Sequence, residues 1–250
     1  MALWTTNTLA RTIEYVQCFC GLRPLTGIGN NLTTFPYEPA CSIGDWVRQT
    51  ILGPPFAWRW NRKETSTINI LQSSQDYTVS LNDFGWIERA MIWGNADCPS
   101  KELVIRNSLA SDQEEDEPSF IAVHKDDNNG SIIFRLLPMP YAAYSMVVTY
   151  QMACPSFSNS TAPASATWAP LPDYLSYVYN AGFLAKAYEQ SGSDKAPWAM
   201  QTFFQLLASA AEGLSDEQRS IVVRHLVADN AGLNQKQPVP SVRYNIAERG

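Results

Sequence analysis

Apolar residues recur every three or four positions near the start of the chain, and this spacing predicts a helix over residues 6–20. Its apolar stripe consists of Leu9, Ile13, Val16 and Cys20. A second helix is predicted over residues 38–52, because Pro39 suits a first helical turn and Gly53, which precedes two prolines, ends the element. The chain therefore opens with two helices joined by a loop.

Between Glu64 and Met152 apolar residues alternate with polar ones and β-branched side chains become frequent, which predicts strands. The predicted strands lie near residues 65–72, 76–81, 85–93, 101–107, 119–124, 131–137 and 144–152. Asn129-Gly130 is a hairpin signal, because glycine accepts the positive φ that a tight turn requires. Short strands separated by turns favour a small antiparallel sandwich or barrel.

Three more helices are predicted after a stretch rich in Pro, Ser, Thr and Ala. They cover residues 173–190, 195–212 and 215–228, and a capping box opens the last one. We therefore expect an α+β fold in which the N- and C-terminal helices form one bundle and the strands form an inserted antiparallel β-sandwich or barrel lobe. The expected divisions are a helical bundle of residues 1–62 and 168–231, a β domain of residues 63–155, a linker of residues 156–167 and an extended C-terminal arm of residues 232–250.

The C-terminal arm differs from the rest of the chain, because Pro238 and Pro240 forbid a helix and favour an extended path. Apolar side chains nevertheless continue along the arm in partial alternation. The candidate anchoring residues are Pro238, Val239, Val242, Tyr244 and Ile246. Either these residues dock into a partner, or the arm is an ordinary frayed terminus.

The composition indicates which kinds of partner the protein could bind. Charged residues make up only 17% of the chain, which contains 8 Trp, 11 Tyr and 10 Phe. This balance is typical of surfaces buried against partners, although a large aromatic core would give the same composition. The net charge of −6 and the lack of a basic stripe argue against tight binding to nucleic-acid phosphates. An acidic protein can still surround DNA without gripping it.

The sequence contains neither a secretory signal nor a stretch apolar enough to span a membrane. Of its 5 cysteines, the only close pair is Cys18 and Cys20, which lie within a predicted helix. This arrangement favours a reducing compartment and free thiols over a disulfide framework.

Residues suited to catalysis are few. His124 and His225 have no second ligand at metal-binding spacing, so we expect neither zinc nor another cofactor. Motifs for nucleotide binding or for a serine nucleophile do not occur in the sequence. A carboxylate pair for glycoside hydrolysis could come from Asp83, Glu88, Asp97 and Glu102. Because most such carboxylates are surface residues, we expect that the protein is not an enzyme.

Tryptophans gather in and around the strand region, at Trp58, Trp60, Trp86, Trp93 and Trp168. Aromatic rings of this kind could form a platform that stacks on a carbohydrate. We favour a structural interpretation. In it, Trp58, Trp60 and Trp168 form the junction between the lobe and the bundle, while Trp86 and Trp93 belong to the core of the lobe.

The order of these parts resembles the head-to-tail adaptor (connector) family of tailed bacteriophages, which includes the tail-tubular connector of short-tailed phages. The resembling pieces are Gly21-Leu22-Arg23-Pro24-Leu25 after the first helix, the junction Phe56-Ala57-Trp58-Arg59-Trp60-Asn61, the inserted strands, and the helices after Trp168-Ala169-Pro170-Leu171-Pro172. The resemblance spans nearly the whole chain. The β block is large for an adaptor, which leaves open the tail type that the protein serves.

The resemblance implies a structural virion protein of the neck or tail, assembled in the host cytoplasm. Copies would form a ring of about twelve subunits beneath the portal protein, with the C-terminal arm inserted between portal subunits. The β lobe would face tail proteins, such as a nozzle, tube or tail terminator, and DNA would pass through the ring during ejection without any contact with a membrane. The alternative function is a distal tail or baseplate protein whose β lobe binds carbohydrate on a host surface.

Overall fold

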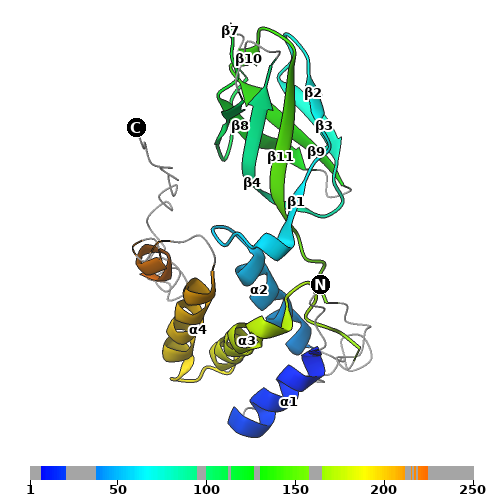
Figure 1. Cartoon of the computed structure of the whole chain (residues 1–250). Coiled ribbons are helices and arrows are strands. Elements are labelled where there is room, and N and C mark those ends of the chain that lie inside the picture. Colours follow the sequence, from blue (N-terminus) through cyan, green and yellow to red (C-terminus); the bar gives the residue numbers. More distant parts are fainter. Residues whose placement is uncertain are drawn as a thin grey trace.

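The structure is a computed structural model, and it describes residues 7–20, 38–94, 100–111, 114–126, 130–157, 165–211, 215, 217 and 219–224. These residues form a mixed α+β fold, with helices at one end of the molecule and strands at the other (Figure 1). The α+β class that the sequence predicted is therefore confirmed.

The helices agree closely with those predicted. They are α1 (Leu9–Cys20), α2 (Ala40–Leu52), α3 (Ser176–Gln190) and α4 (Ala196–Ala210), with 3-10 turns at Arg59–Asn61 and Asp173–Leu175. The predicted segment 173–190 thus begins with a 3-10 turn before it becomes regular helix. Of the last predicted helix, residues 219–224 are helical, whereas residues 225–228 lie outside the described part of the chain.

Helices α1 to α4 share one apolar core, although the strand region separates them into two pairs along the sequence. Fully buried members of this core include Leu9 of α1, Ile43 of α2, Phe183 of α3 and Phe203 of α4. α3 approaches α4 closely at Gly182, where an added Cβ atom would lie 2.7 Å from the Phe203 ring. An isolated antiparallel bridge between Thr8 and Thr167 adds a backbone link. Segments from both sides of the strand region therefore fold together.

Strands occupy every predicted strand segment. They are β1 (Arg62–Glu64), β2 (Ile68–Ile70), β3 (Asp76–Ser80), β4 (Phe84–Trp93), β5 (Lys101–Glu102), β6 (Val104–Ile105), β7 (Glu115–Asp116), β8 (Phe120–Asp126), β9 (Ser131–Leu137), β10 (Met139–Pro140) and β11 (Tyr144–Met152). The alternation does not predict β1, β7 and β10, because strands of two or three residues carry too little periodic signal.

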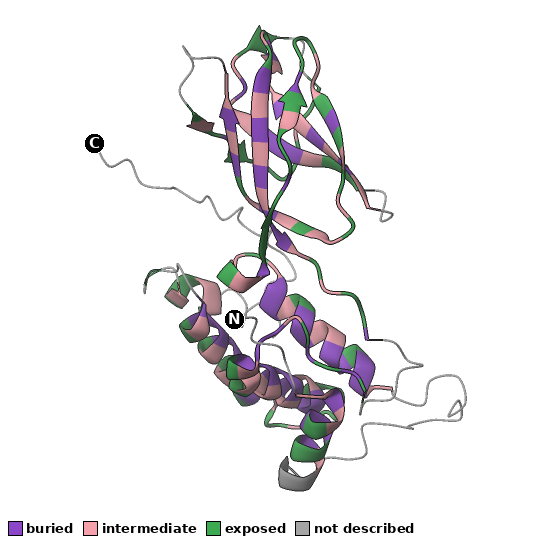
Figure 2. Ribbon diagram, turned by 45° about the vertical axis from the view of Figure 1, so that its right-hand side comes forward, coloured by how far each residue is buried: buried purple, intermediate pink, exposed green. Residues whose placement is uncertain are grey.

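The described strands form three sheets, with orders β1-β11-β4-β5, β3-β9-β8-β6 and β10-β7, and β2 also pairs with β11. The two larger sheets share one apolar cluster, which includes Ile92, Val148, Ile121 and Phe134. Buried and more exposed residues alternate along the longer strands, as expected for sheets with one face toward a core (Figure 2). The predicted β8–β9 hairpin is antiparallel, and Gly130 has a φ of +84°.

The predicted strand over residues 101–107 changes from one sheet to the other. The Leu103 amide donates a hydrogen bond to the Ala90 carbonyl on β4 at 2.9 Å, whereas the next amide, of Val104, donates to the Ser119 carbonyl beside β8, also at 2.9 Å. The segment therefore appears as β5 in one sheet and β6 in the other. The β6–β8 pair is parallel, as is the β7–β10 pair, and these are the departures from the expected antiparallel arrangement in the described strands.

Candidate functional site

The helical and strand parts meet at a junction formed by the end of α2, the 3-10 turn Arg59–Asn61, and the adjoining ends of β1, β4 and β11 (Figure 1). Gln151 on β11 is fully buried at this junction. Its Oε1 accepts a hydrogen bond from the Trp58 amide at 3.2 Å, and its Nε2 donates to the Trp58 carbonyl at 3.2 Å and to Glu88 Oε2 at 2.6 Å. One side chain thus binds both backbone groups of Trp58, and the Trp58 carbonyl also accepts from the Asn61 amide at 3.1 Å. Burial of the Trp58 amide without a partner would cost about 1–3 kcal/mol.

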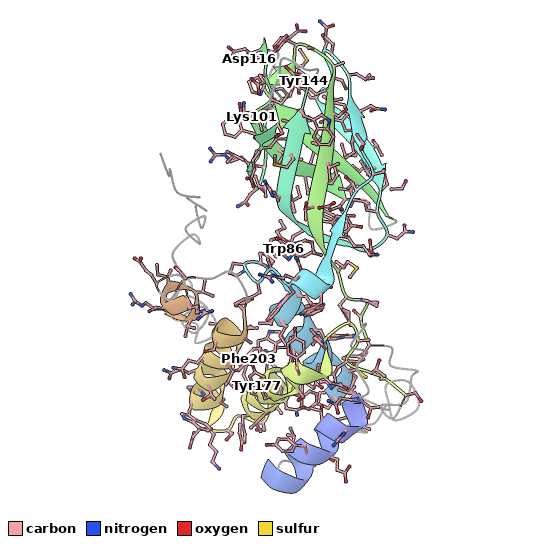
Figure 3. All side chains as sticks on the ribbon, viewed as in Figure 1. Trp86, Lys101, Asp116, Tyr144, Tyr177 and Phe203 are labelled. Carbon is pink, nitrogen blue, oxygen red and sulfur yellow. The ribbon has the colours of Figure 1, made fainter. Side chains whose placement is uncertain are left out.

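The C-terminal carbonyls of α2 bind indoles from both parts of the molecule. The last carbonyls of a helix have no partner within the helix. Trp58 Nε1 donates to the Ile51 carbonyl at 2.7 Å, and Trp86 Nε1, from β4, donates to the Leu52 carbonyl at 2.9 Å. Trp86 accordingly lies where β4 approaches α2 (Figure 3). These two bonds fix the end of the helix to the sheet.

An ion pair joins β1 to β4 beside the side-chain amide of Gln151. Arg62 Nε donates to Glu88 Oε2 at 2.9 Å, and Arg62 Nη2 pairs with Glu88 Oε1. Glu88 occupies a β-bulge, because its neighbours on either side both pair with β11 while Glu88 itself is left out of the ladder. Its carboxylate binds Arg62 and Gln151 together.

A second bulge in β4 depends on Gly85. A Cβ atom there would lie 2.7 Å from the Gln151 carbonyl oxygen and 3.0 Å from the Ala153 nitrogen. Both are backbone atoms, so no side-chain rotation would relieve the overlap. Gly85 therefore allows β11 to pass close to β4 as it enters the junction.

Asp83 and Tyr150 form a further polar pair near the junction. Tyr150 Oη donates to Asp83 Oδ1 at 2.9 Å, and Lys63 pairs with the other carboxylate oxygen. Burial would raise the pKa of Asp83, but the hydrogen bonds from Lys63 and Tyr150 outweigh it and lower that pKa. Burial, followed by the hydrogen bond to Asp83, raises the pKa of Tyr150 to about 12. At neutral pH the pair is a carboxylate and a neutral phenol, which suits a structural role.

The predicted junction tryptophans occupy two different places. Trp58 is buried at the junction, and its ring lies 5.6 Å from that of Trp60. Trp168 instead lies inside the helical core, where it stacks on Tyr179 at 4.6 Å and donates from Nε1 to Thr12 Oγ1 at 3.0 Å. The returning chain thus enters the helical core before the helices resume.

Arg48 on α2, which the sequence analysis missed, holds this returning chain. It is 4% exposed, and it donates to the Pro155 carbonyl at 2.7 Å, the Ala169 carbonyl at 3.2 Å and Asp45 at 2.9 Å. Its guanidinium also lies 3.4 Å from the centre of the Phe157 ring. An arginine within an otherwise apolar helical stripe is the signal that could have indicated this role.

The candidate catalytic residues are dispersed or engaged in ion pairs. Glu102 lies 3.4 Å from Arg89, and the exposed His124 lies 3.1 Å from Arg135, which also binds Asp76. Asp97 and His225 lie outside the described residues. An open hollow of about 370 Å³ on the strand part is lined by Arg106, Ser108, Leu109, Phe120, Leu137 and Pro138. Within the described ranges no group of three or more His, Cys, Asp and Glu gathers in a metal-binding arrangement.

The tryptophans do not form an exposed platform in the part of the chain that the structure describes. Trp58 and Trp168 are buried, Trp86 is bound to α2, and Trp60 and Trp93 are half-buried. Among the described tryptophans, only Trp198, on α4, is exposed, with 66% of its surface accessible.

The candidate arm anchors, namely Pro238, Val239, Val242, Tyr244 and Ile246, lie outside the described residues. The described helices include none that is both long and apolar enough to cross a membrane. No protein-family model matches the sequence, and the comparison with curated proteins finds no match.

Proposed function

We propose that this chain is a structural virion protein, one subunit of a head-to-tail adaptor ring that docks beneath the portal protein and connects the capsid to the tail. In this proposal the helices form a bundle of residues 1–62 and 168–231. An antiparallel β-sandwich of residues 63–155 is inserted in it as a lobe, and a linker of residues 156–167 leads back. Residues 232–250 form the arm that docks.

The observation that carries the proposal is that helices from both sides of the strand region share one core. Val222 and Val223 pack against that core, and Arg219 donates to the Ala211 carbonyl at 3.4 Å. Residues 219–224 thus belong to the helical body, and in this proposal the arm begins after that body. An extended segment with spaced apolar side chains gains its ordering energy only when it docks, which would make assembly conditional on the portal.

The charge of the chain agrees with a DNA channel. The net charge is −6, and like charges would let the genome pass through the ring without being held. The ring would contain copies of this chain, with the portal protein on one side and tail proteins on the other. No step of this proposed function is catalytic, and none requires a cofactor.

The decisive experiment is electron microscopy of the full chain mixed with the portal protein of the same particle, beside a version that lacks residues 233–250. We expect a ring beneath the portal with the full chain and none with the shortened one. Circular dichroism of the shortened chain should retain the helical signal, because the described members of the helical core all precede residue 233.

A matched pair of variants separates anchoring from chain length. Replacing Val242, Tyr244 and Ile246 together with serine should abolish attachment, whereas replacing Gln235, Gln237 and Asn245 with serine should preserve it. If the shortened chain joins the portal as tightly as the full chain, the arm is not the anchor. If neither version adds a ring, the protein is not an adaptor.

A further inference from the structure

The end of the strand part farthest from the helices presents a compact surface, which we call the distal tip. It consists of residues 71–74, 114–116 and 139–144. Asp116 and Tyr144 mark it in Figure 3, and β7 and β10 mark it in Figure 1. Three separate stretches of the sequence meet there, because β10 pairs with β7 and β2 pairs with β11.

Two large apolar side chains are exposed at the distal tip. Leu71 is 63% exposed and Tyr141 is 48% exposed. Leu71 follows Ile70, which pairs with Tyr144, and the Tyr144 ring contacts that of Tyr141 edge-on at 6.0 Å. The two exposed side chains therefore lie on adjoining segments of the distal tip, which the Ser73–Pro140 backbone hydrogen bond joins. Exposing apolar side chains to water is unfavourable, and a partner that covers them removes this cost.

Hydrogen bonds hold the turn that carries Leu71 in one conformation. The Ser73 amide donates to the Pro140 carbonyl at 2.8 Å, and Ser73 Oγ donates to Glu115 at 2.6 Å. Tyr77 Oη donates to the Leu71 and Ser74 carbonyls at 3.0 and 2.5 Å. A surface held in this way loses little conformational entropy when a partner binds.

The charge around the two apolar side chains is negative. Glu114, Glu115 and Asp116 are all exposed, and the segments that form the distal tip contain no Lys or Arg. Three carboxylates beside an apolar centre disfavour phosphate-bearing partners such as nucleic acid or anionic lipid, and they attract Lys and Arg side chains.

We propose that the distal tip is a docking surface for a protein that presents an apolar side chain surrounded by Lys or Arg. Leu71 and Tyr141 would supply the buried centre of the contact, and the carboxylates would form its charged rim. This inference does not rest on docking of the arm, because it concerns the opposite end of the molecule from the helices and uses none of the same residues.

The test uses the full chain and three short capped peptides, composed of Leu and Lys, of Ser and Lys, and of Leu and Glu. Binding is measured by calorimetry and located by amide chemical shifts. We expect the Leu–Lys peptide to shift the distal-tip amides and to bind at least about tenfold more tightly than either other peptide, with an affinity that falls as salt is added.

Two double variants separate the apolar contribution to binding from the charged one. Leu71→Ser with Tyr141→Ser keeps the full charge and should weaken Leu–Lys binding about tenfold, the loss typical of a central contact. Glu115→Gln with Asp116→Asn keeps the hydrogen-bond acceptors and should weaken binding and remove most of its salt dependence.

Two matched double variants serve as controls and should bind as the unaltered protein does. One is Val104→Ser with Ile105→Ser, which replaces exposed apolar residues on β6. The other is Glu14→Gln with Asp194→Asn, which replaces exposed acids on the helical part.

Three results would overturn the proposal. The first is equal binding of the Ser–Lys and Leu–Lys peptides, which would mean non-specific attraction to an acidic protein. The second is binding that survives in the Leu71→Ser, Tyr141→Ser variant. The third is an oligosaccharide, such as a chitin fragment, that shifts the distal-tip amides when the Leu–Lys peptide does not, which would assign the surface to carbohydrate.

Discussion

At the scale of single residues, the pKa of Asp83 results from two opposing effects. Burial opposes its negative charge, whereas hydrogen bonds from Lys63 and Tyr150 favour it, and the result is a pKa below the ordinary value. A carboxyl whose pKa is lower in the folded than in the unfolded chain stabilises the fold above the unfolded pKa, which is about 3.9. That stabilisation is lost as the pH falls through the folded pKa.

We therefore predict a pH-dependent effect of Lys63→Met. At pH 7 the variant should have a lower free energy of unfolding than the unaltered protein, by at most about 1 kcal/mol, because solvent screens a pair in which both side chains are more than a third exposed. The difference should vanish below the folded pKa of Asp83. Urea unfolding at a series of pH values measures it. Lys125→Met, at an exposed position on β8, is the control, and a difference that stays constant with pH would contradict the assignment.

The residues at the junction differ in how far the sequence reveals them. Trp58 and Trp60 are conspicuous because tryptophan is rare and large, and sequence analysis identified them as candidates. Gln151 and Gly85 are not conspicuous, since a glutamine near a strand end and a glycine in a strand are ordinary. Their roles arise from contacts across more than 60 positions of sequence, which periodicity does not report.

At the scale of elements, α2 anchors both segments of the chain that cross between the helical part and the strand part. Its C-terminal carbonyls bind Trp58 and Trp86, and its Arg48 binds the carbonyls of Pro155 and Ala169 on the returning chain. A helix with a single buried cation can thus fix a segment that has little regular structure of its own.

We predict that Arg48→Met destabilises the protein by about 3 kcal/mol, because it leaves two carbonyls and Asp45 without this partner while it preserves much of the side-chain volume. Thermal or urea unfolding measures the loss. Gln49→Met, at the neighbouring exposed position of α2, should change stability by less than about 0.5 kcal/mol. A small loss at position 48 would mean that the returning chain is held by the Phe157 and Trp168 rings instead.

Local patterns predicted the elements well, and pairing between elements poorly. Helical spacing and alternation are properties of neighbouring residues, so α1 to α4 and the longer strands follow from them. The change of sheet between Leu103 and Val104 depends on β4 and β8, which are distant in sequence, and the alternation continues across it. The parallel pairing of β6 with β8, and of β7 with β10, is likewise a matter of topology rather than of local sequence.

At the scale of the whole molecule, two apolar cores are joined by a small polar junction. The helices share one cluster and the strands the other, and the buried amide of Gln151 connects the β11 end of the second to Trp58 of the first. A polar contact is specific in geometry, because it requires its partners at fixed positions, whereas apolar contacts tolerate small displacements. The junction can therefore transmit unfolding of one core to the other.

We predict that Gln151→Leu both destabilises the protein and uncouples the two cores. Leucine fills a similar volume but leaves the Trp58 amide without its partner, at a cost of about 1–3 kcal/mol, while the Trp58 carbonyl keeps the hydrogen bond from the Asn61 amide at 3.1 Å. In the unaltered protein, amides of α2 to α4 and of β4 and β11 should lose protection from hydrogen exchange at the same urea concentration. In the variant, the strands and the helices should lose protection at separate concentrations.

Gln201→Leu, at an exposed position on α4, is the matched control and should preserve the single transition. Loss of protection in both parts at one lower urea concentration would have a different meaning: the amide contributes stability, but other contacts, such as the bond from Trp86 to α2, couple the cores. Adding Trp86→Phe, which removes that bond while keeping an aromatic ring, should then separate the two transitions. Coupling that survives both substitutions would mean that apolar contact alone makes the two cores one cooperative unit.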